Sequence, residues 1–276
     1  MTRQPVDLYL DLMKQTLAFN LWPEPPTPID TFNYRNSLPT RIVVSLISRI
    51  LGTRQLQLVR KCVIPADQKQ EGRMWPGYAH TMIGMQRLDN LHSCIETALR
   101  EGIEGDFIET GVWRGGSCIL MRAILAAHGI ADRKVYVADS FAGLPKPDSA
   151  KYPADKGDTY YTHSFLAVSR DEVERNFRSF KLLDDQVVFL EGWFQDTLPN
   201  APMKQLAVAR LDGDMYGSTM DALRSLYPKL SKGGFCIIDD YALSRCKQAV
   251  DEFRTEQGIL AEMKVVDWTG VYWRKD

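Results

Sequence analysis

The sequence lacks an excess of charge of either sign. Lys plus Arg number 34 and Asp plus Glu number 35 among 276 residues, which leaves a formal net charge of -1. Proteins that bind nucleic acid or an acidic membrane surface usually carry a basic excess, because it attracts phosphate groups. We therefore expect neither a nucleic acid nor a membrane as a partner.

Cysteine is scarce, and none of the five cysteines forms a C-x-x-C pair. An odd number of cysteines set mostly among apolar residues is typical of buried thiols in a reducing compartment. Long apolar runs are lacking too, since a bilayer span takes about 20 such residues. The first residues, MTRQPVDLYLDLMKQ, do not resemble a signal peptide. These features predict a cytoplasmic protein.

The N-terminal part of the chain is helical in spacing but interrupted by proline. Residues 21–30 hold four prolines, which neither a helix nor a central strand accommodates. The apolar spacing predicts helices over residues 1–20, 40–61 and 80–102. We therefore expect an N-terminal helical extension over residues 1–75, acting as a lid or an oligomer contact, and a main domain over residues 76–276.

The helix expected over residues 40–61 is amphipathic. Ile42, Leu46 and Ile50 share its apolar face, and arginines are aligned beside them. This pattern favours a helix that covers the main domain or contacts a second subunit over one that lies on a membrane surface.

From residue 105 onwards, short β-rich runs alternate with helical runs. The predicted strands are residues 106–112, 134–141, 186–193, 205–213 and 234–241, and the predicted helices are residues 115–129, 171–181, 218–230 and 246–258. Such alternation indicates a parallel sheet with helices on both faces. Residues 263–268 and 270–275 are typical of a closing antiparallel hairpin. The predicted fold class is a doubly wound α/β sheet.

The dinucleotide-binding pattern G-x-G-x-x-G is absent from the first strand-to-helix turn. Its sequence, FIETGVWRGGS, places Glu109 at the strand edge and Gly111, Gly115 and Gly116 where the backbone must turn tightly. Asp139, in VADSFAG, follows the second strand, where an acidic residue binds ribose hydroxyls in Rossmann-like sites. These two features indicate an adenosine-type cofactor without separating NAD from S-adenosylmethionine. The missing pyrophosphate loop favours S-adenosylmethionine.

Two pairs of aspartates follow later strands. Asp212 and Asp214 end the run RLDGD, and Asp239 and Asp240 end the run IIDDY. If the two strands are neighbours, three or four carboxylates converge within about 5 Å. Like charges repel at that distance unless a cation or shared protons neutralise them. Carboxylates without clustered His or Cys suit a hard cation, Mg²⁺ first and Ca²⁺ or Mn²⁺ after it.

The residues after the first of these pairs also suggest how the next helix begins. Ser218 is followed three residues later by Asp221, which is the spacing of a capping box. We therefore assign Asp214 to the turn before the helix. Asp212, last on its strand, remains the candidate for chemistry.

Seven stretches together resemble the macrocin O-methyltransferase family, whose Mg²⁺-dependent members methylate sugar hydroxyls on tylosin-type macrolides and related antibiotics. They are HTMIGMQRLDNLHSC, GDFIETGVWRGGSCILMRAILAAHG, VADSFAGLP, LEGWFQDTLP, KQLAVARLDGDMYGSTMDAL, GGFCIIDDY and GVYWR, in order over residues 75–275. The resemblance implies a class I methyltransferase fold, S-adenosylmethionine and Mg²⁺ as cofactors, a small-molecule glycoside as substrate, and a homo-oligomer of two or more subunits.

The same resemblance implies roles for individual residues. It assigns the metal to Asp212, Asp239 and Asp240, and the general base to Asp212. The residues implied to surround S-adenosylmethionine are Thr81, Met82, Glu109, Thr110, Gly111, Val112, Trp113, Asp139, Ser140, Phe141, Gly143, Gly192, Trp193, Phe194 and Asp212. We take His163, in the loop GDTYYTHSF, and Tyr241 as candidates for contact with the acceptor.

Three other functions stay open on the sequence. A catechol-type O-methyltransferase would use the same metal on an aromatic diol. A binding protein could keep the fold without activity, although the acidic residues at the strand ends argue against that reading. An NAD-dependent enzyme is the third alternative.

Overall fold

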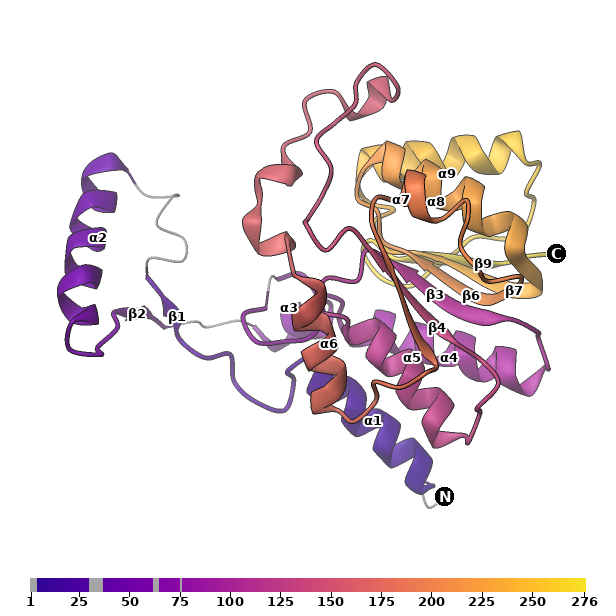
Figure 1. The fold of residues 1–276 in the computed structure, drawn as a ribbon, viewed down its shortest axis with the longest axis horizontal. Helices are drawn as coiled ribbons and strands as arrows, with labels where there is room; N and C mark the ends of the chain where they lie inside the picture. Colours follow the sequence, from indigo (N-terminus) through magenta and orange to yellow (C-terminus); the bar gives the residue numbers. More distant parts are fainter. Residues whose placement is uncertain (1–3, 30–36, 62–64, 75) are drawn as a thin grey trace.

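A computed structural model describes residues 4–29, 37–61, 65–74 and 76–276 (Figure 1). Its centre is a seven-stranded sheet in the order β5-β4-β3-β6-β7-β9-β8. The strands are β3 (Asp106–Thr110), β4 (Val135–Asp139), β5 (Val187–Glu191), β6 (Leu206–Leu211), β7 (Leu230–Ile238), β8 (Lys264–Val265) and β9 (Val271–Arg274). The first five are parallel, and β9 runs antiparallel to β7 and β8. The predicted doubly wound sheet with a closing hairpin is confirmed.

The strand order reverses beside β3. The chain passes from β3 outwards to β4 and β5, and it then returns to β6 on the other side of β3. At such a reversal the connections leave in opposite directions, and a crevice forms beyond the carboxyl ends of the strands. The residues that follow β3 and β6 therefore face a common space.

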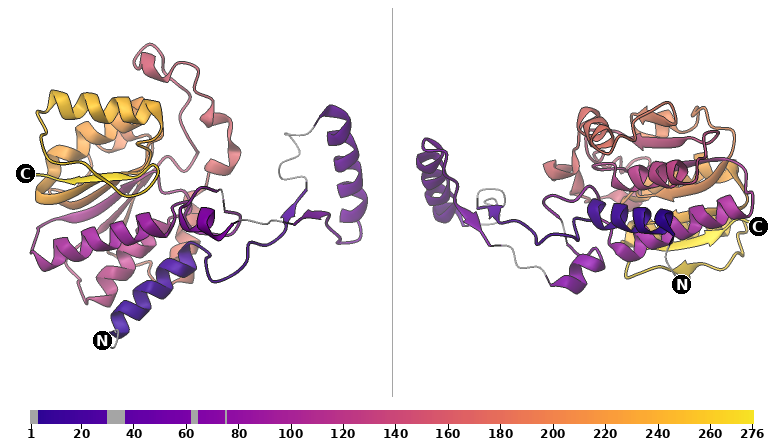
Figure 2. Two further views of the ribbon diagram at one scale, coloured as in Figure 1. Left: turned by 180° about the vertical axis from the view of Figure 1, so that it is seen from behind. Right: turned by 90° about the horizontal axis from the view of Figure 1, so that it is seen from below.

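Helices cover both faces of the sheet (Figures 1 and 2). One face carries α1 (Pro5–Leu17), α4 (Met85–Arg100) and α5 (Gly116–Ala127), and the other carries α8 (Tyr216–Leu226) and α9 (Ser244–Glu256). The shorter connections are α6 (Arg170–Ser179), α7 (Phe194–Thr197) and the 3₁₀ turns η2 (Pro153–Asp155), η3 (Tyr160–Thr162), η4 (Ser164–Leu166) and η5 (Tyr227–Lys229). Two apolar cores result, one on each side of the sheet.

Helix α1 belongs to one of these cores. Leu10, Met13 and Leu17 are buried in the cluster that α4 and α5 build on the sheet. The backbone N–H of His80 donates to the carbonyl of Leu17 at 2.8 Å and ties the end of α1 to the segment before α4. Helix α1 is therefore part of this core, and the division of the chain at residue 75 stays a prediction.

The segment after α1 stands away from the sheet (Figure 2). It contains α2 (Leu38–Gly52) and the short antiparallel pair β1 (Thr27–Pro28) and β2 (Val59–Arg60). The chain then returns to the main body at α3 (Ala66–Gln70), where the indole N–H of Trp268 donates to the carbonyl of Glu71 at 3.0 Å. The helix predicted over residues 40–61 is therefore too long, because the backbone turns at Gln55, where φ is +56°, and becomes extended. Since Ile42, Leu46 and Ile50 are exposed, α2 does not cover the main domain. A contact with a second subunit stays a prediction.

Two expectations drawn from scarce residue types can be compared with the structure. Cys94, Cys118, Cys236 and Cys246 are free and buried, as expected, whereas Cys62 lies outside the described residues. Among the helices of residues 4–29, 37–61, 65–74 and 76–276, none is long and apolar enough to cross a membrane.

Candidate active site

A cavity of about 650 Å³ opens at the carboxyl ends of the parallel strands. This volume lies within the range of about 300–1,000 Å³ that is usual for small-molecule sites. The structure brings most of the predicted residues to its wall: Thr81, Met82, Glu109, Gly111, Val112, Trp113, Asp139, Ser140, Gly143, His163, Trp193, Phe194, Asp212, Asp239 and Asp240. The cavity therefore joins the predicted cofactor residues to both acidic pairs.

Four predicted residues do not line this cavity: Thr110, Phe141, Gly192 and Tyr241. Thr110 is fully buried within β3, and the ring of Phe141 packs against Phe189 in the core. The hydroxyl of Tyr241 donates to Oδ1 of Asp251 on α9 at 2.6 Å. The geometry therefore gives no support to Tyr241 as an acceptor contact.

Gly111 allows the exits of β3 and β6 to touch. Its φ is +78°, and a Cβ at this position would lie 2.0 Å from the carbonyl oxygen of Asp212. The N–H of Asp212 donates to the carbonyl of Thr110 at 3.0 Å. Only a glycine fits this close approach in a left-handed conformation, so the glycine turn sets the position of Asp212.

Asp139 organises the neighbouring turn. Its carboxylate accepts hydrogen bonds from the N–H groups of Val112 and Phe141, each at 2.7 Å. Burial raises the pKa of Asp139, while these backbone donors act in the opposite direction. The carboxylate thus orders the loops after β3 and β4, at the place where the sequence predicted a ribose contact.

The segment before α4 lies over the N-terminus of α5. The helix predicted over residues 80–102 begins only at Met85, and the residues before it form a loop. The N–H of Gly116 donates to the carbonyl of His80 at 2.9 Å, and a Cβ on Gly116 would lie 2.6 Å from the same oxygen. This contact brings Thr81 and Met82 to the cavity wall.

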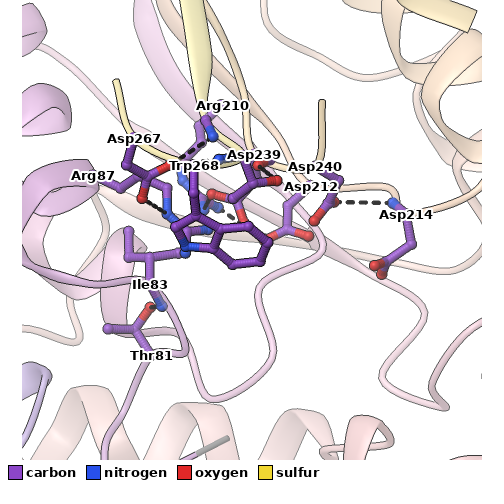
Figure 3. A network of polar contacts seen from close by, with 12 residues as sticks. Thr81, Ile83, Arg87, Arg210, Asp212, Asp214, Asp239, Asp240, Asp267 and Trp268 are labelled. Carbon is purple, nitrogen blue, oxygen red and sulfur yellow. Dashed lines mark hydrogen bonds and ion pairs between the residues drawn. The ribbon is translucent and has the colours of Figure 1, made fainter. Parts of the chain in front are cut away.

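Two arginines neutralise part of the acidic wall (Figure 3). Arg210, fully enclosed on β6, donates to Glu109 across the strand pair and to Asp239. Arg87, on α4, donates to Asp239 at 2.6 Å and to Asp267 at 2.9 Å. Burial alone would raise the pKa of Asp239, but the two guanidinium groups hold this pKa below its usual value.

The remaining carboxylates have little such compensation. One oxygen each of Asp212, Asp214 and Asp240 lies within 4.8 Å of the others. The N–H of Asp214 donates to Oδ2 of Asp240 at 3.1 Å, and Nη1 of Arg210 lies 3.2 Å from Oδ2 of Asp212 (Figure 3). Burial, and after it the repulsion among neighbouring aspartates, raises the pKa of all three well above its ordinary value. We call these three residues the acidic group.

The start of α8 differs from the predicted capping box. The helix begins at Tyr216, and Met215 at the N-cap position makes no side-chain hydrogen bond to it. Instead, the carboxylate of Asp155 accepts from the N–H groups of Tyr216 and Gly217, each at 2.8 Å. Asp221 accepts from the hydroxyl of Tyr152. The prediction of a capping box at Ser218 is wrong, because Asp155, a residue distant in sequence, supplies the cap.

Several cavity residues were missed by the sequence reasoning. Arg210 carried a signal, because an arginine inside the apolar run LAVARL needs a buried partner. Arg87, Asp155 and Trp268 sit in stretches whose pattern says nothing about the site, and only the folded chain brings them to the cavity.

Comparison with known proteins shows the family. The model of the macrocin-O-methyltransferase (TylF) family matches residues 6–275. The chain belongs to this family. Membership of the family, together with the fold, implies use of S-adenosylmethionine, and the protein is an S-adenosylmethionine-dependent O-methyltransferase.

Individual proteins are similar to this chain over almost their whole length. The 8-demethyl-8-(2,3-dimethoxy-alpha-L-rhamnosyl)-tetracenomycin-C 4'-O-methyltransferase of Streptomyces olivaceus is 47% identical, over 99% of this chain and 95% of its own. The mycinamicin III 3''-O-methyltransferase of Micromonospora griseorubida is 44% identical, over 98% and 97%. The solved structure of the O-methyltransferase NovP is 44% identical, with a TM-score of 0.83 over 98% of this chain and 99% of that one.

Proposed function

We propose that the protein transfers the methyl group of S-adenosylmethionine to a hydroxyl of a sugar on a natural-product glycoside, with assistance from Mg²⁺. The observation that carries the proposal is the acidic group, which shares one cavity with the glycine turn after β3. The name of the tetracenomycin relative includes a rhamnosyl group, which supports a sugar as acceptor.

The residues around the glycine turn fit the methyl donor. Val112 and Trp113 follow the turn, Asp139 lies beside them, and the aromatic side chains of Trp193 and Phe194 complete this part of the wall. A carboxylate suits ribose hydroxyls, and aromatic rings suit an adenine. When bound, S-adenosylmethionine supplies an electrophilic methyl group. The protein contributes the placement of acceptor and donor, which by itself accounts for a large share of such rate enhancements.

The acidic group fits a hard divalent cation. Its ligand atoms are carboxylate oxygens, which Mg²⁺ prefers. Asp212 and Asp240 belong both to this group and to the ligand set that the family resemblance implies, so we propose these two as metal ligands. The resemblance adds Asp239 and the geometry adds Asp214. When bound, the cation would lower the pKa of an acceptor hydroxyl.

Asp212 is also the base that we propose. A sugar hydroxyl is a weak nucleophile until its proton is removed, and the carboxylate of Asp212, which faces the cavity within the acidic group, is placed to accept that proton. Arg210 holds Oδ2 of Asp212 at 3.2 Å, so the side chain has a fixed orientation. Tyr160 and His163, on the segment after β4, enclose the cavity beside it.

The test is the substitution Asp212→Asn. We expect turnover to fall by at least about 100-fold, the usual size of general-base catalysis, while calorimetry finds S-adenosylmethionine bound as in the wild type. Asp132→Asn changes an exposed aspartate before β4, at the opposite end of the strands, and should leave both quantities unchanged. Turnover near the wild-type rate would remove Asp212 from the mechanism. Comparing glycosides with catechols as acceptors tests the substrate class, and activity confined to catechols would overturn the proposed sugar.

A further inference from the structure

The cap of α8 comes from the long connection between β4 and α6. Asp155 is 2% exposed, and each of its carboxylate oxygens accepts one N–H from the first turn of the helix. A carboxylate at this place satisfies donors that have no partner within the helix and interacts favourably with the helix dipole. Residues that cap a helix usually lie next to it in sequence; here the cap is 61 residues away from Tyr216.

Gly217 makes this contact possible. A Cβ at position 217 would lie 2.4 Å from the ring of Tyr152 and 3.0 Å from Oδ2 of Asp155. Its φ is not in the left-handed region, so a glycine is needed here because there is no room for a side chain, and not because of its backbone conformation. The start of α8 is therefore shaped to receive residues 152–155.

The same connection is attached to α9. Arg245, in the first turn of α9, pairs with Asp158 at 3.2 Å and donates to the carbonyls of Ala154 and Lys156. Asp158 also accepts from the N–H of Tyr160 at 2.7 Å. Because Tyr160 lines the cavity, this second attachment fixes the part of the cavity wall that the connection after β4 forms, where we expect the acceptor to bind.

The turn held by Asp155 carries two of the three members of the acidic group, Asp212 and Asp214. Only Gly213, Asp214 and Met215 separate Asp212 from Tyr216. Asp214 adopts a left-handed conformation, with φ of +52°, and its N–H reaches Asp240. Aspartate adopts this conformation more readily than most non-glycine residues. Asp155 fixes the C-terminal end of this turn, as Gly111 fixes its beginning.

We propose that Asp155 is a positioning residue for the acidic group. By capping α8 from the connection after β4, it holds the turn 212–215 in the conformation that gathers the carboxylates. It also couples that turn to the part of the cavity wall that the same connection forms. Asp155 touches neither of the carboxylates proposed as metal ligands, so its effect is transmitted through the backbone of Tyr216 and Gly217. The inference rests on the proposed function.

The experiment measures the affinity of the protein for Mn²⁺ by electron paramagnetic resonance, without donor or acceptor. We expect Asp155→Ala to weaken Mn²⁺ binding by about tenfold, which corresponds to about 1.4 kcal/mol, the range of a lost helix cap. Asp155→Asn keeps one acceptor oxygen, and Asn is as good a cap as Asp, so this variant should recover most of the affinity. The affinity for S-adenosylmethionine, measured by calorimetry, should stay within about twofold, because the glycine turn is untouched.

A matched control separates positioning from general loss of stability. Ser169 caps α6 by accepting from the N–H of Glu172 at 3.3 Å. Ser169→Ala should lower the melting temperature to a similar extent as Asp155→Ala and leave Mn²⁺ affinity unchanged. Equal Mn²⁺ affinity in Asp155→Ala and the wild type overturns the positioning role alone. Absence of Mn²⁺ binding in the wild type overturns the proposed metal site and this inference with it. If Asp155→Ala does not fold, the Mn²⁺ affinity of Asp155→Ser is compared with that of the wild type instead. The single, shorter hydroxyl does not replace both carboxylate oxygens, so weaker Mn²⁺ binding is still expected, and equal affinity overturns the positioning role.

Discussion

Asp239 and Asp240 are adjacent in the chain, and their charges are balanced in different ways. Arg87 and Arg210 each donate to one oxygen of Asp239. Asp240 faces Asp212 and Asp214, and its carboxylate accepts the backbone N–H of Asp214 at 3.1 Å. The pKa of Asp239 is lowered by its two guanidinium neighbours against the effect of burial, whereas burial and the neighbouring aspartates raise the pKa of Asp240.

The protein's own arginines thus neutralise Asp239, whereas Asp240 belongs with Asp212 and Asp214 to the group that we propose to bind a cation. Removing one side of an aspartate held by two arginines destabilises the fold, because it leaves an unpaired buried charge. A cluster of ionised aspartates destabilises the fold and gains from any bound cation. If the proposed metal site holds, neighbouring residues of the same type serve structure at Asp239 and ligand binding at Asp240.

Arg210→Met should have the largest effect on stability. The substitution leaves Glu109 and Asp239 buried without their shared cation. Breaking a buried ion pair from one side costs about 3–5 kcal/mol, so we expect the free energy of unfolding in urea to fall by about that amount. Arg178→Met removes an arginine whose side chain is 58% exposed beside Glu174, where a pair contributes at most about 1 kcal/mol. If both variants lose a similar free energy of unfolding, the buried ion pairs of Arg210 contribute no more to stability than an exposed pair.

A contrast between two neighbouring substitutions tests the comparison directly. Asp239→Asn should lower the free energy of unfolding by about 2 kcal/mol and change Mn²⁺ affinity little. Asp240→Asn should weaken Mn²⁺ binding by about tenfold or more and leave stability without metal equal or higher, because a repelling charge is removed. Urea unfolding and paramagnetic resonance give the two readouts. If Asp239→Asn weakens Mn²⁺ binding as strongly as Asp240→Asn, Asp239 is a metal ligand, as the family resemblance implies.

Much of the fold could be predicted from the sequence, because buried parallel strands and amphipathic helices impose clear periodicities. Strands β3 to β7 were each found within a few residues of their bounds. The boundaries of α2 and α4 were less accurate, since nothing in the apolar spacing marks the turn at Gln55 or the loop before Met85. The cap of α8 could not be predicted, because it depends on a contact between segments far apart in sequence.

The candidate site was predictable where it depends on strand ends. Asp139, Asp212 and Asp240 follow strands, and the parallel arrangement brings them to one edge. The different surroundings of Asp239 and Asp240 were not predictable in this way. They depend on Arg87, which reaches Asp239 from a helix 152 residues earlier, and on the direction in which each aspartate side chain leaves its turn.

His80 extends the comparison to a group that burial keeps neutral, and its substitution should have the smallest effect. Burial, with Arg114 adding to it, lowers the pKa of His80 from 6.5, and the imidazole lies edge-on to Phe180. Because the folded-state pKa is depressed, the stability that neutral His80 contributes is complete above the unfolded value and is lost as pH falls below about 6.5. His80→Phe keeps an aromatic ring in this place and cannot be protonated. Between pH 7.5 and 5.5, we expect the free energy of unfolding in urea to fall by up to about 1 kcal/mol more in the wild type than in this variant, since the side chain is only partly buried. If the free energy of unfolding depends on pH in the same way in both proteins, His80 does not titrate as proposed.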